Sequence, residues 1–474
     1  MTTSASFSTG LVGALLAAAL VVPSSAQAQP VPGTEGIGDA YFPLDGNGGI
    51  DVVSYRIEDR YQFPTKRLSG RTLLTIEATQ DLSAFNLDLL LPVRWVTVDG
   101  VPAAHDKPYR HEVEIMPAQP IKDGATFTVE VAYAGRPNAI GYLGEKNWLA
   151  NRHEVVTMNQ PHMATWWFPS NDHPSDKALM DISITVPRGK QVFANGQRVS
   201  ITREGGLATH RWRAEEPMST YLAMFAAGDF QVASGVRDGL PWSAIVSKQM
   251  TRDQRQDNLG LMRETPRVVE GLEEDLGVYP FDQVGGLVTG LNVSFALENQ
   301  TLPTYPITGR GYTWLVVHEL AHQWFGDSVG LRRWKDIWLN EGAATFMEVR
   351  WEETHGGRSG SEWLRSAYEG RSAESSFWDL AIGDPGADDI FAGPIYTRGA
   401  MTFQALRNLI GERDFWTLLR TWVSENRYGL GTRGAFEEVA EDVSGEDLGR
   451  FFRVWLDARR KPDDIAANGL GGLG

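Results

Sequence analysis

The sequence of 474 residues contains no cysteine. This absence excludes disulfide bonds, thiolate metal ligands and a cysteine nucleophile. It does not identify the compartment, because a chain of this length can build a sizeable hydrophobic core without cross-links. Positive charge is also scarce, since 44 Lys and Arg stand against 60 Asp and Glu, for a formal net charge of −16. That balance argues against a nucleic-acid or anionic-membrane partner.

Long hydrophobic runs are missing as well. Leu11 to Val22 is apolar or small in character, but a membrane span needs about 20 apolar residues. Ala26-Gln27-Ala28 follows and has the form of a cleavage site. We therefore predict a signal peptide over residues 1–28, cleaved near Ala28, and export to a periplasm or the cell exterior. The run lacks the usual preceding Lys or Arg, so a disordered, alanine-rich start is the alternative.

After residue 28, the sequence pattern changes once, from strand-like to mainly helical. Residues 29–38 are rich in Pro and Gly and are typical of a linker. From 39 to 236, short alternating runs separated by turn signals predict an all-β domain with sheets packed face to face. Residues 237–460 are mainly helical in pattern, with a small β patch, and residues 461–474 are Gly-rich and predict a flexible tail.

The most informative pattern combines His318, Glu319 and His322 with a downstream Glu341. On a helix, residues i and i+4 lie on one face, so both imidazoles can reach one zinc ion at roughly 2.0–2.1 Å. Glu319 would flank the ion without binding it and could take a proton from its water. Three protein ligands leave the fourth position open, which is typical of a catalytic zinc site.

The chain contains an internal control for this pattern. His-Glu occurs three times, but only the third pair has a histidine four residues after the first. Bulky apolar residues precede that pair, and a second predicted helix from 336 to 353 carries Glu341 near its start. Two neighbouring helices could therefore bring the three predicted ligands to one point.

These motifs resemble those of the gluzincin aminopeptidases, peptidase family M1. The similarity covers His318 through Gly326, Glu341 within 338–342, and the loop from Trp167 to Lys177, and it extends over nearly all of the chain after residue 28. It implies an α+β fold: an N-terminal all-β sandwich or saddle domain followed by a thermolysin-like, mainly helical catalytic domain with a small sheet. It also implies one Zn²⁺ per chain, held by His318, His322 and Glu341.

The resemblance assigns residues that would bind the substrate. The family's Gly-Ala-Met-Glu-Asn motif matches residues 295–299, with departures at Phe295 and Leu297. Glu298 would hold the free α-ammonium of the substrate through a charge-assisted hydrogen bond, and Ala296 and Asn299 would line the same site. Counting back from Phe168-Pro169, Gln160 matches a second amine contact, although a glutamine at the end of a strand is an equal alternative.

Two residues lie beyond the zinc helix. Tyr396, in a Tyr-x-x-Gly-Ala context, resembles the family's tyrosine that donates to the oxyanion of the tetrahedral intermediate. Asp327 could contact a ligand histidine, but a solvent-exposed residue at a helix end is the more ordinary interpretation. The 78 residues after Tyr396 leave no room for the domains that cover the site in longer family members, so we expect an open cleft that admits longer peptides.

We therefore predict a monomeric, secreted zinc aminopeptidase acting on peptides with a free N-terminus. A thermolysin-like endopeptidase is the first alternative, and the role of Glu298 separates the two. A lipid-epoxide hydrolase is disfavoured, because in the family that activity accompanies a C-terminal helical domain. A non-catalytic peptide-binding relative is the last alternative. Such relatives usually lose a ligand or the base, whereas this chain keeps both.

Overall fold

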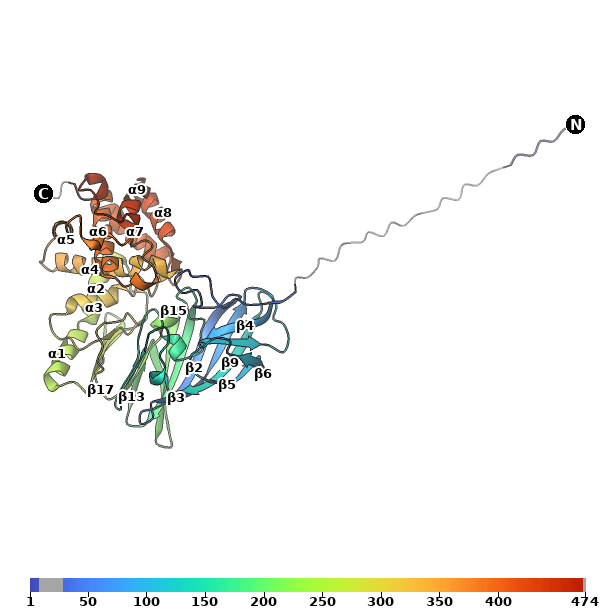
Figure 1. Cartoon of the computed structure of the whole chain (residues 1–474), viewed down its shortest axis with the longest axis horizontal. Helices are drawn as coiled ribbons and strands as arrows, with labels where there is room; N and C mark the ends of the chain where they lie inside the picture. The colour runs from blue at the N-terminus through green and yellow to red at the C-terminus, as the bar shows by residue number, and fades with distance from the viewer. Residues whose placement is uncertain (8–28, 472–474) are drawn as a thin grey trace.

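The computed structural model describes residues 1–7 and 29–471 and consists of a β-rich part followed by a helical part (Figure 1). The predicted signal peptide lies outside the described residues over 8–28, and so do residues 472–474. Among the described residues, no helix is both long and apolar enough to cross a membrane. One continuous hydrophobic core runs through both parts, and the predicted α+β class is confirmed.

The largest sheet has eight strands in the order β14-β15-β12-β2-β3-β9-β5-β6. Buried and more exposed residues largely alternate along β2, as expected for a strand with one packed face. All neighbours in this sheet are antiparallel except β2 and β12. The strands are β2 (Ile50–Gln62), β3 (Arg67–Ala78), β5 (Val93–Val98), β6 (Val101–Pro102), β9 (Thr126–Gly135), β12 (Lys177–Pro187), β14 (Gln197–Glu204) and β15 (Leu207–Ser219).

Two four-stranded sheets complete the β-rich part. One has the order β1-β4-β8-β7 and the other β10-β11-β16-β13. The strands are β1 (Val31–Pro32), β4 (Leu82–Asp88), β7 (Ala104–Asp106), β8 (Glu112–Met116), β10 (Trp148–Ala150), β11 (Val155–Thr157), β13 (Gln191–Ala194) and β16 (Phe225–Gly228). Strand β1 falls within the predicted linker 29–38, yet it pairs in parallel with β4. That segment is therefore attached to the β-rich part.

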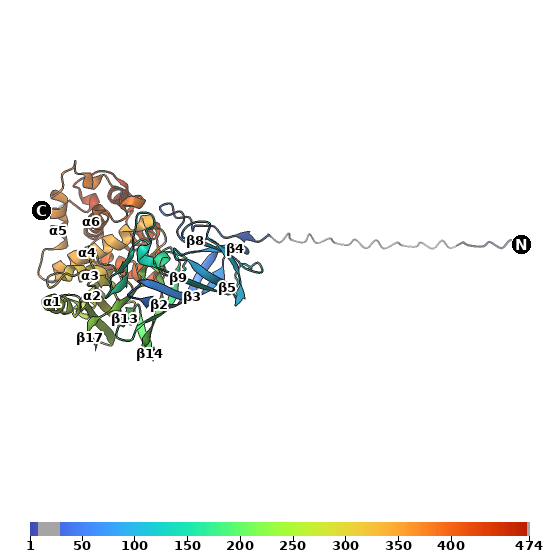
Figure 2. The same ribbon diagram turned by 60° about the horizontal axis from the view of Figure 1, so that its bottom comes forward.

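A fourth sheet, of order β17-β18-β19-β20, corrects the predicted domain boundary. Its strands are β17 (Phe230–Arg237), β18 (Leu240–Ser247), β19 (Val284–Val288) and β20 (Thr304–Tyr305). The boundary predicted between 236 and 237 cuts the antiparallel hairpin of β17 and β18. In two views β17 lies beside α1 (Arg252–Met262) (Figures 1 and 2). Because a hairpin forms as one unit, β17 belongs with the catalytic part.

The helical part holds the segments that carry the metal motif. It comprises α1, α2 (Thr265–Leu276), α3 (Thr313–Ala321), α4 (Trp338–Thr354), α5 (Gly360–Glu369), α6 (Gly393–Ile410), α7 (Glu412–Glu425), α8 (Arg433–Ser444) and α9 (Gly449–Phe452), with a short parallel pair β21 (Gly330–Leu331) and β22 (Leu430–Gly431). Helices α4 and α6 meet at Gly342 and Gly399, where a Cβ added to Gly342 would lie 2.8 Å from the Gly399 Cα. This close approach brings the helix of Glu341 against that of Tyr396.

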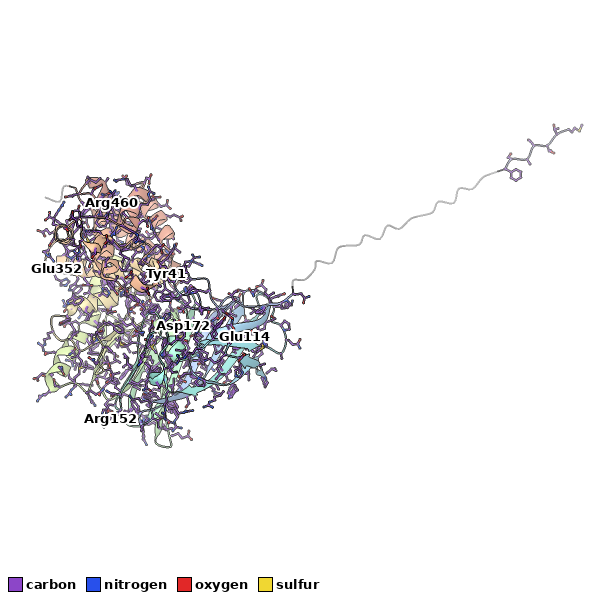
Figure 3. The ribbon with its side chains drawn as sticks, viewed as in Figure 1. Tyr41, Glu114, Arg152, Asp172, Glu352 and Arg460 are labelled. Carbon is purple, nitrogen blue, oxygen red and sulfur yellow. The ribbon has the colours of Figure 1, made fainter. Side chains whose placement is uncertain are left out.

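The two parts are tied together near the start of the described chain. Tyr41, at their junction in Figure 3, donates its hydroxyl hydrogen to Asp384 and accepts a hydrogen bond of 2.9 Å from the Gly386 N–H. The Lys177 ammonium, at the start of β12, also donates to the backbone oxygen of Asp327 at 2.8 Å. Contacts of this kind fix β-rich loops against the helical part.

The predicted flexible tail is wrong for residues 461–471. Leu470 is fully buried, and the indole N–H of Trp455 donates to the Asn468 oxygen at 3.1 Å. The Asn468 amide in turn donates to the Asp463 oxygen at 2.8 Å. The Gly-rich composition suggested a loose segment, but a buried leucine and these hydrogen bonds hold it in place.

Candidate active site

Two helices deliver three side chains to one point. His318 lies near the end of α3, and His322 follows that helix with helical dihedral angles of φ −58° and ψ −25°. Glu341 lies in the first turn of α4. The two histidine Nε2 atoms are 3.1 Å apart, and each is 3.3 Å from Oε2 of Glu341. Ligands at 2.0–2.1 Å around a tetrahedral zinc are about 3.3–3.4 Å apart, so this donor set fits zinc.

The second nitrogen of each imidazole is also engaged. His318 Nδ1 lies 2.7 Å from Oε1 of Glu348, and His322 Nδ1 donates to the Phe325 carbonyl oxygen at 3.0 Å. A hydrogen on Nδ1 leaves the lone pair of Nε2 directed at the metal position. Sequence reasoning missed Glu348. Its signal was the spacing of seven residues from Glu341, which places both carboxylates on one face of α4.

The charge of Glu341 is compensated by the two histidines of the same site. Burial acts to raise the pKa of Glu341, but His322 and His318 outweigh it and lower that pKa to about 2. The carboxylate is therefore ionised beside the two imidazoles.

Glu319 is buried beside the ligands without belonging to the set of three. Burial raises the pKa of its carboxyl group to about 8, against the opposing effect of His318 and His322. Its position beside the ligands, outside the set of three, suits a group that exchanges a proton with a water at the metal position.

Tyr396, near the start of α6, stacks on a ligand. Its ring lies 6.0 Å from the His318 ring, centroid to centroid, at an interplanar angle of 25°. Burial raises the pKa of the phenol, and the nearby Glu341, Glu298 and Glu319 raise it further. The hydroxyl therefore keeps its proton and can act as a hydrogen-bond donor next to the metal position.

The predicted amine anchor joins the two parts of the molecule. Gln160, from the loop after β11, donates its amide hydrogen to Oε1 of Glu298 at 3.1 Å. Glu298 lies between β19 and β20 and is 2% exposed. Burial raises the pKa of Glu298, while His322 and Tyr221 lower it. Tyr221, which sequence reasoning missed, comes from the 3-10 turn Thr220–Leu222 and carried no motif signal.

The backbone of the anchor loop is held by Gln323, which follows the second ligand. Its Nε2 donates to the Glu298 carbonyl oxygen at 3.0 Å, and its Oε1 accepts from the Thr301 N–H at 2.8 Å. Thr301 has a φ of +67°, a left-handed conformation that a threonine adopts only when its surroundings enforce it. Gln323 therefore connects the loop of Glu298 to the segment of the metal ligands through hydrogen bonds.

Two predicted residues lie elsewhere. Asn299 is fully buried outside the cavity, and its amide donates to the Leu222 oxygen at 3.1 Å, so its side chain supports the loop and does not line the site. Ala296 does line the cavity. Asp327 is fully buried, contrary to the exposed position expected of it, and the His322 Nδ1 proton goes to Phe325 and not to Asp327.

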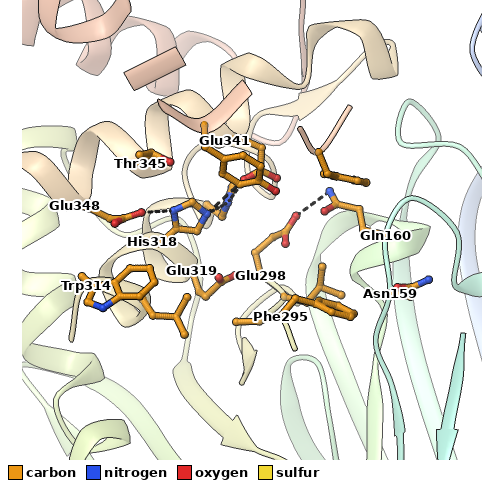
Figure 4. A pocket seen from close by; sticks show the side chains of 16 residues that line it. Asn159, Gln160, Phe295, Glu298, Trp314, His318, Glu319, Glu341, Thr345 and Glu348 are labelled. Carbon is orange, nitrogen blue, oxygen red and sulfur yellow. Dashed lines mark hydrogen bonds and ion pairs between the residues drawn. The ribbon is translucent and has the colours of Figure 1, made fainter. Parts of the chain in front are cut away.

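The predicted residues surround one cavity of about 540 Å³ (Figure 4). Its wall also contains aromatic side chains that no motif indicated. The lining residues are Asn159, Gln160, Phe295, Ala296, Leu297, Glu298, Trp314, Leu315, His318, Glu319, His322, Glu341, Thr345, Glu348, Phe391 and Tyr396.

Comparison with known sequences gives matches along most of the chain. Residues 54–222 match the peptidase M1 N-terminal domain, and residues 286–455 match the peptidase family M1 domain. Aminopeptidase N of Lactococcus lactis subsp. cremoris is 25% identical over 432 residues, which are 83% of this chain and 49% of that protein. Probable M1 family aminopeptidase 2 of Encephalitozoon cuniculi is 27% identical over 337 residues, 64% of this chain and 38% of that protein. The chain spans about half the length of these relatives or less.

Solved structures match over the full length of the neighbour. The M1 zinc metallopeptidase of Deinococcus radiodurans has a TM-score of 0.81 and 28% identity, over 90% of this chain and 99% of that one. A mutant of that enzyme bound to a Tyr-Ser-Ala substrate has a TM-score of 0.80 and 27% identity, over 91% and 100%. Two domain matches, the shared architecture and a donor set that fits zinc therefore agree. The chain belongs to peptidase family M1.

Proposed function

We propose that the protein is a zinc-dependent aminopeptidase. One observation carries this proposal: the amine anchor lies directly against the metal site. Glu298, Glu319 and His322 each offer an atom within 4.8 Å of the others. In a peptide, the terminal nitrogen and the carbonyl carbon of the first residue are only about 2.5 Å apart, because two bonds join them. An ammonium held by Glu298 therefore brings the first peptide bond, and no later one, to the metal position.

The residues of the chain divide the chemistry between them. His318, His322 and Glu341 would hold zinc, which would supply a Lewis acid for the scissile carbonyl. Glu319 takes a proton from the attacking water and delivers it to the nitrogen of the leaving amine. Tyr396 donates its phenolic hydrogen to the developing oxyanion. Gln160 and Glu298 bind the ammonium and fix its distance from the reacting carbonyl.

The endopeptidase alternative requires peptide chain on both sides of the scissile bond. On the amine side, a chain extended beyond one residue would have to displace the Gln160–Glu298 contact of 3.1 Å. The non-catalytic alternative gives no reason for a buried Glu319 beside a complete ligand set. Both observations favour the aminopeptidase.

The size of the cavity bears on which first residues are accepted. The related Deinococcus radiodurans enzyme has been solved with Tyr-Ser-Ala, and a two-domain M1 zinc metallopeptidase has been solved with L-tryptophan and with L-arginine. The cavity of about 540 Å³ found here can hold side chains of that size, and Phe295, Phe391 and Leu315 supply apolar surface. We propose that large first residues are among its substrates.

The deciding experiment uses a panel of aminoacyl arylamides with the wild-type enzyme and Glu298→Ala. The wild type should release arylamine in the presence of zinc, lose activity with phenanthroline and spare N-acetylated peptides. Glu298→Ala should lose most activity while keeping one equivalent of zinc by elemental analysis. An enzyme that cuts N-acetylated and free peptides equally fast would be an endopeptidase, and activity unaffected by the chelator would exclude zinc catalysis.

We also propose export, on the basis of the short apolar run and the Ala26-Gln27-Ala28 sequence. N-terminal sequencing of the protein recovered from fractionated expressing cells tests this. A mature chain that starts at Gln29 in the exported fraction is expected, whereas an intact N-terminus in the cytoplasmic fraction would contradict export.

A further inference from the structure

A second cavity of about 640 Å³ adjoins the active-site cavity. Trp314, Thr345 and Glu348 line both, so the two hollows meet at these three side chains. The second cavity continues along the outer half of α4 toward the start of α5. Its lining residues are Gly311, Trp314, Thr345, Glu348, Val349, Trp351, Glu352, His355, Gly356, Gly357 and Trp363.

The direction of a bound peptide follows from the proposed function, on which this inference rests. In Figure 4, Trp314, Thr345 and Glu348 lie on one side of His318, while Asn159 and Gln160 lie on the other. Because the terminal ammonium is held on the Gln160 side, the peptide beyond the scissile bond must extend toward the shared residues. The second cavity therefore receives residues that follow the first peptide bond.

The walls of the second cavity are aromatic. Trp314 is 47% exposed, whereas Trp351 already stacks on His355, with ring centroids 3.8 Å apart, and carries the Arg267 guanidinium 5.6 Å from its ring centroid. Trp363 comes from α5 and lines the same hollow. Faces of tryptophan rings attract cations such as the guanidinium group of arginine.

The second cavity is lined by two glutamates, Glu348 and Glu352, and by no Lys or Arg among the described residues. Glu348 uses Oε1 to hold His318, and Glu352 is at the edge of the helical part in Figure 3 with a side-chain exposure of 45%. Arg358 donates to Oε1 of Glu352 at 3.4 Å from outside the cavity, which leaves Oε2 for a ligand cation. The second cavity therefore presents the carboxylates of Glu348 and Glu352 to an entering peptide.

We propose that this second cavity binds the residues that follow the scissile bond and that it selects Arg or Lys among those residues. The ammonium or guanidinium group binds between the side chains of Trp314 and Trp363 and the Glu352 carboxylate. Acidic residues at the same position are disfavoured, because Glu348 and Glu352 repel them.

Three tripeptides test the inference: Ala-Ala-Arg, Ala-Ala-Ala and Ala-Ala-Glu, with release of the first alanine measured by chromatography. The wild type should show a kcat/KM for Ala-Ala-Arg about three- to tenfold above that for Ala-Ala-Ala, as expected for an exposed cation–π contact with an ion pair. Ala-Ala-Glu should be the poorest substrate. The preference for arginine should decline as salt is added, because exposed charges are screened.

Two variants test whether Glu352 causes the preference for arginine. Glu352→Gln should reduce the ratio of the two kcat/KM values toward one, through KM. Glu369→Gln, an exposed glutamate at the end of α5 that lines neither cavity, should keep the wild-type ratio. The inference is overturned if the Arg and Ala tripeptides are cleaved equally well, or if the preference for arginine survives in Glu352→Gln. In either case the proposed function still holds, provided that alanine arylamide is cleaved. A zinc-loaded wild type that cleaves neither the arylamide nor any tripeptide overturns both.

Discussion

The Nδ1 atom of His318 lies 2.7 Å from Oε1 of Glu348, so a carboxylate two turns along α4 from Glu341 orients a ligand on α3. The same helix thus supplies one metal ligand directly and positions another. A carboxylate that accepts from Nδ1 also increases the electron density that Nε2 offers to the metal. Glu348 is therefore part of the reason that the two helices form a preorganised site.

Replacing Glu348 with glutamine should weaken zinc binding. Losing a partner of this kind typically costs about 10–100-fold in metal affinity or activity. Competition with a chromogenic chelator measures the affinity, and excess zinc should restore part of the activity. Glu352→Gln, one turn further along α4, is the matched control, since Glu352 contacts Arg358 and no metal ligand. Equal zinc affinity in Glu348→Gln and wild type would show that the contact does not support the site.

Replacing Glu319 with glutamine should separate binding from catalysis. The amide keeps the shape of the side chain but cannot accept the proton of water, and positioned general bases contribute about 10²–10⁴-fold in rate. The variant should keep one zinc per chain and bind substrate, with kcat reduced by that factor. If zinc were lost together with activity, Glu319 would have to be counted as a structural support of the metal site.

Tyr396→Phe removes a hydroxyl and leaves the stacked ring on His318. The expected loss is about 10²–10³ in kcat with little change in KM, because the hydrogen bond forms chiefly in the transition state. Tyr312→Phe is a suitable control, since Tyr312 is 44% exposed and outside the cavity lining. A variant whose KM rises while kcat is kept would place Tyr396 in ground-state binding.

The metal ligands could be predicted from the sequence because local spacing and helix geometry alone place His318 and His322 on one face. The amine contacts could be predicted only by resemblance, since nothing local connects Gln160 to Glu298 across 138 positions. Glu348 was missed because its spacing of seven residues from Glu341 places both carboxylates on one helix face without showing which residue of α3 that face meets. Strand β17 was assigned to the wrong part because alternation predicts a strand without predicting its partner.

Asn299 shows the limit of carrying residues over from a motif. The asparagine is retained beside Glu298, but its side chain points into the protein and donates to Leu222. In a loop of this kind neighbouring side chains point in different directions, and only the three-dimensional structure decides which of them reach the cavity.

Asp59, far from the metal, should make stability depend on pH. Its buried carboxylate accepts from the Trp167 indole at 2.7 Å and from the Tyr133 hydroxyl at 2.9 Å. Burial nevertheless raises its pKa from 3.8 to about 7. Because the folded state holds this proton more tightly than the unfolded state, the contribution to stability is full below about pH 4 and is lost as the pH rises toward 7.

The variant Asp59→Asn cannot lose that proton. The free energy of unfolding of Asp59→Asn minus that of the wild type should therefore rise between pH 4 and pH 7, by up to about 4 kcal/mol, and then level off. Urea unfolding at a series of pH values measures it, with Asp51→Asn, an exposed carboxylate on the same strand, as the control. A difference that stays flat across this range, or that falls, would mean that Asp59 is ionised in the folded protein at low pH and that its two hydrogen bonds outweigh the cost of burial.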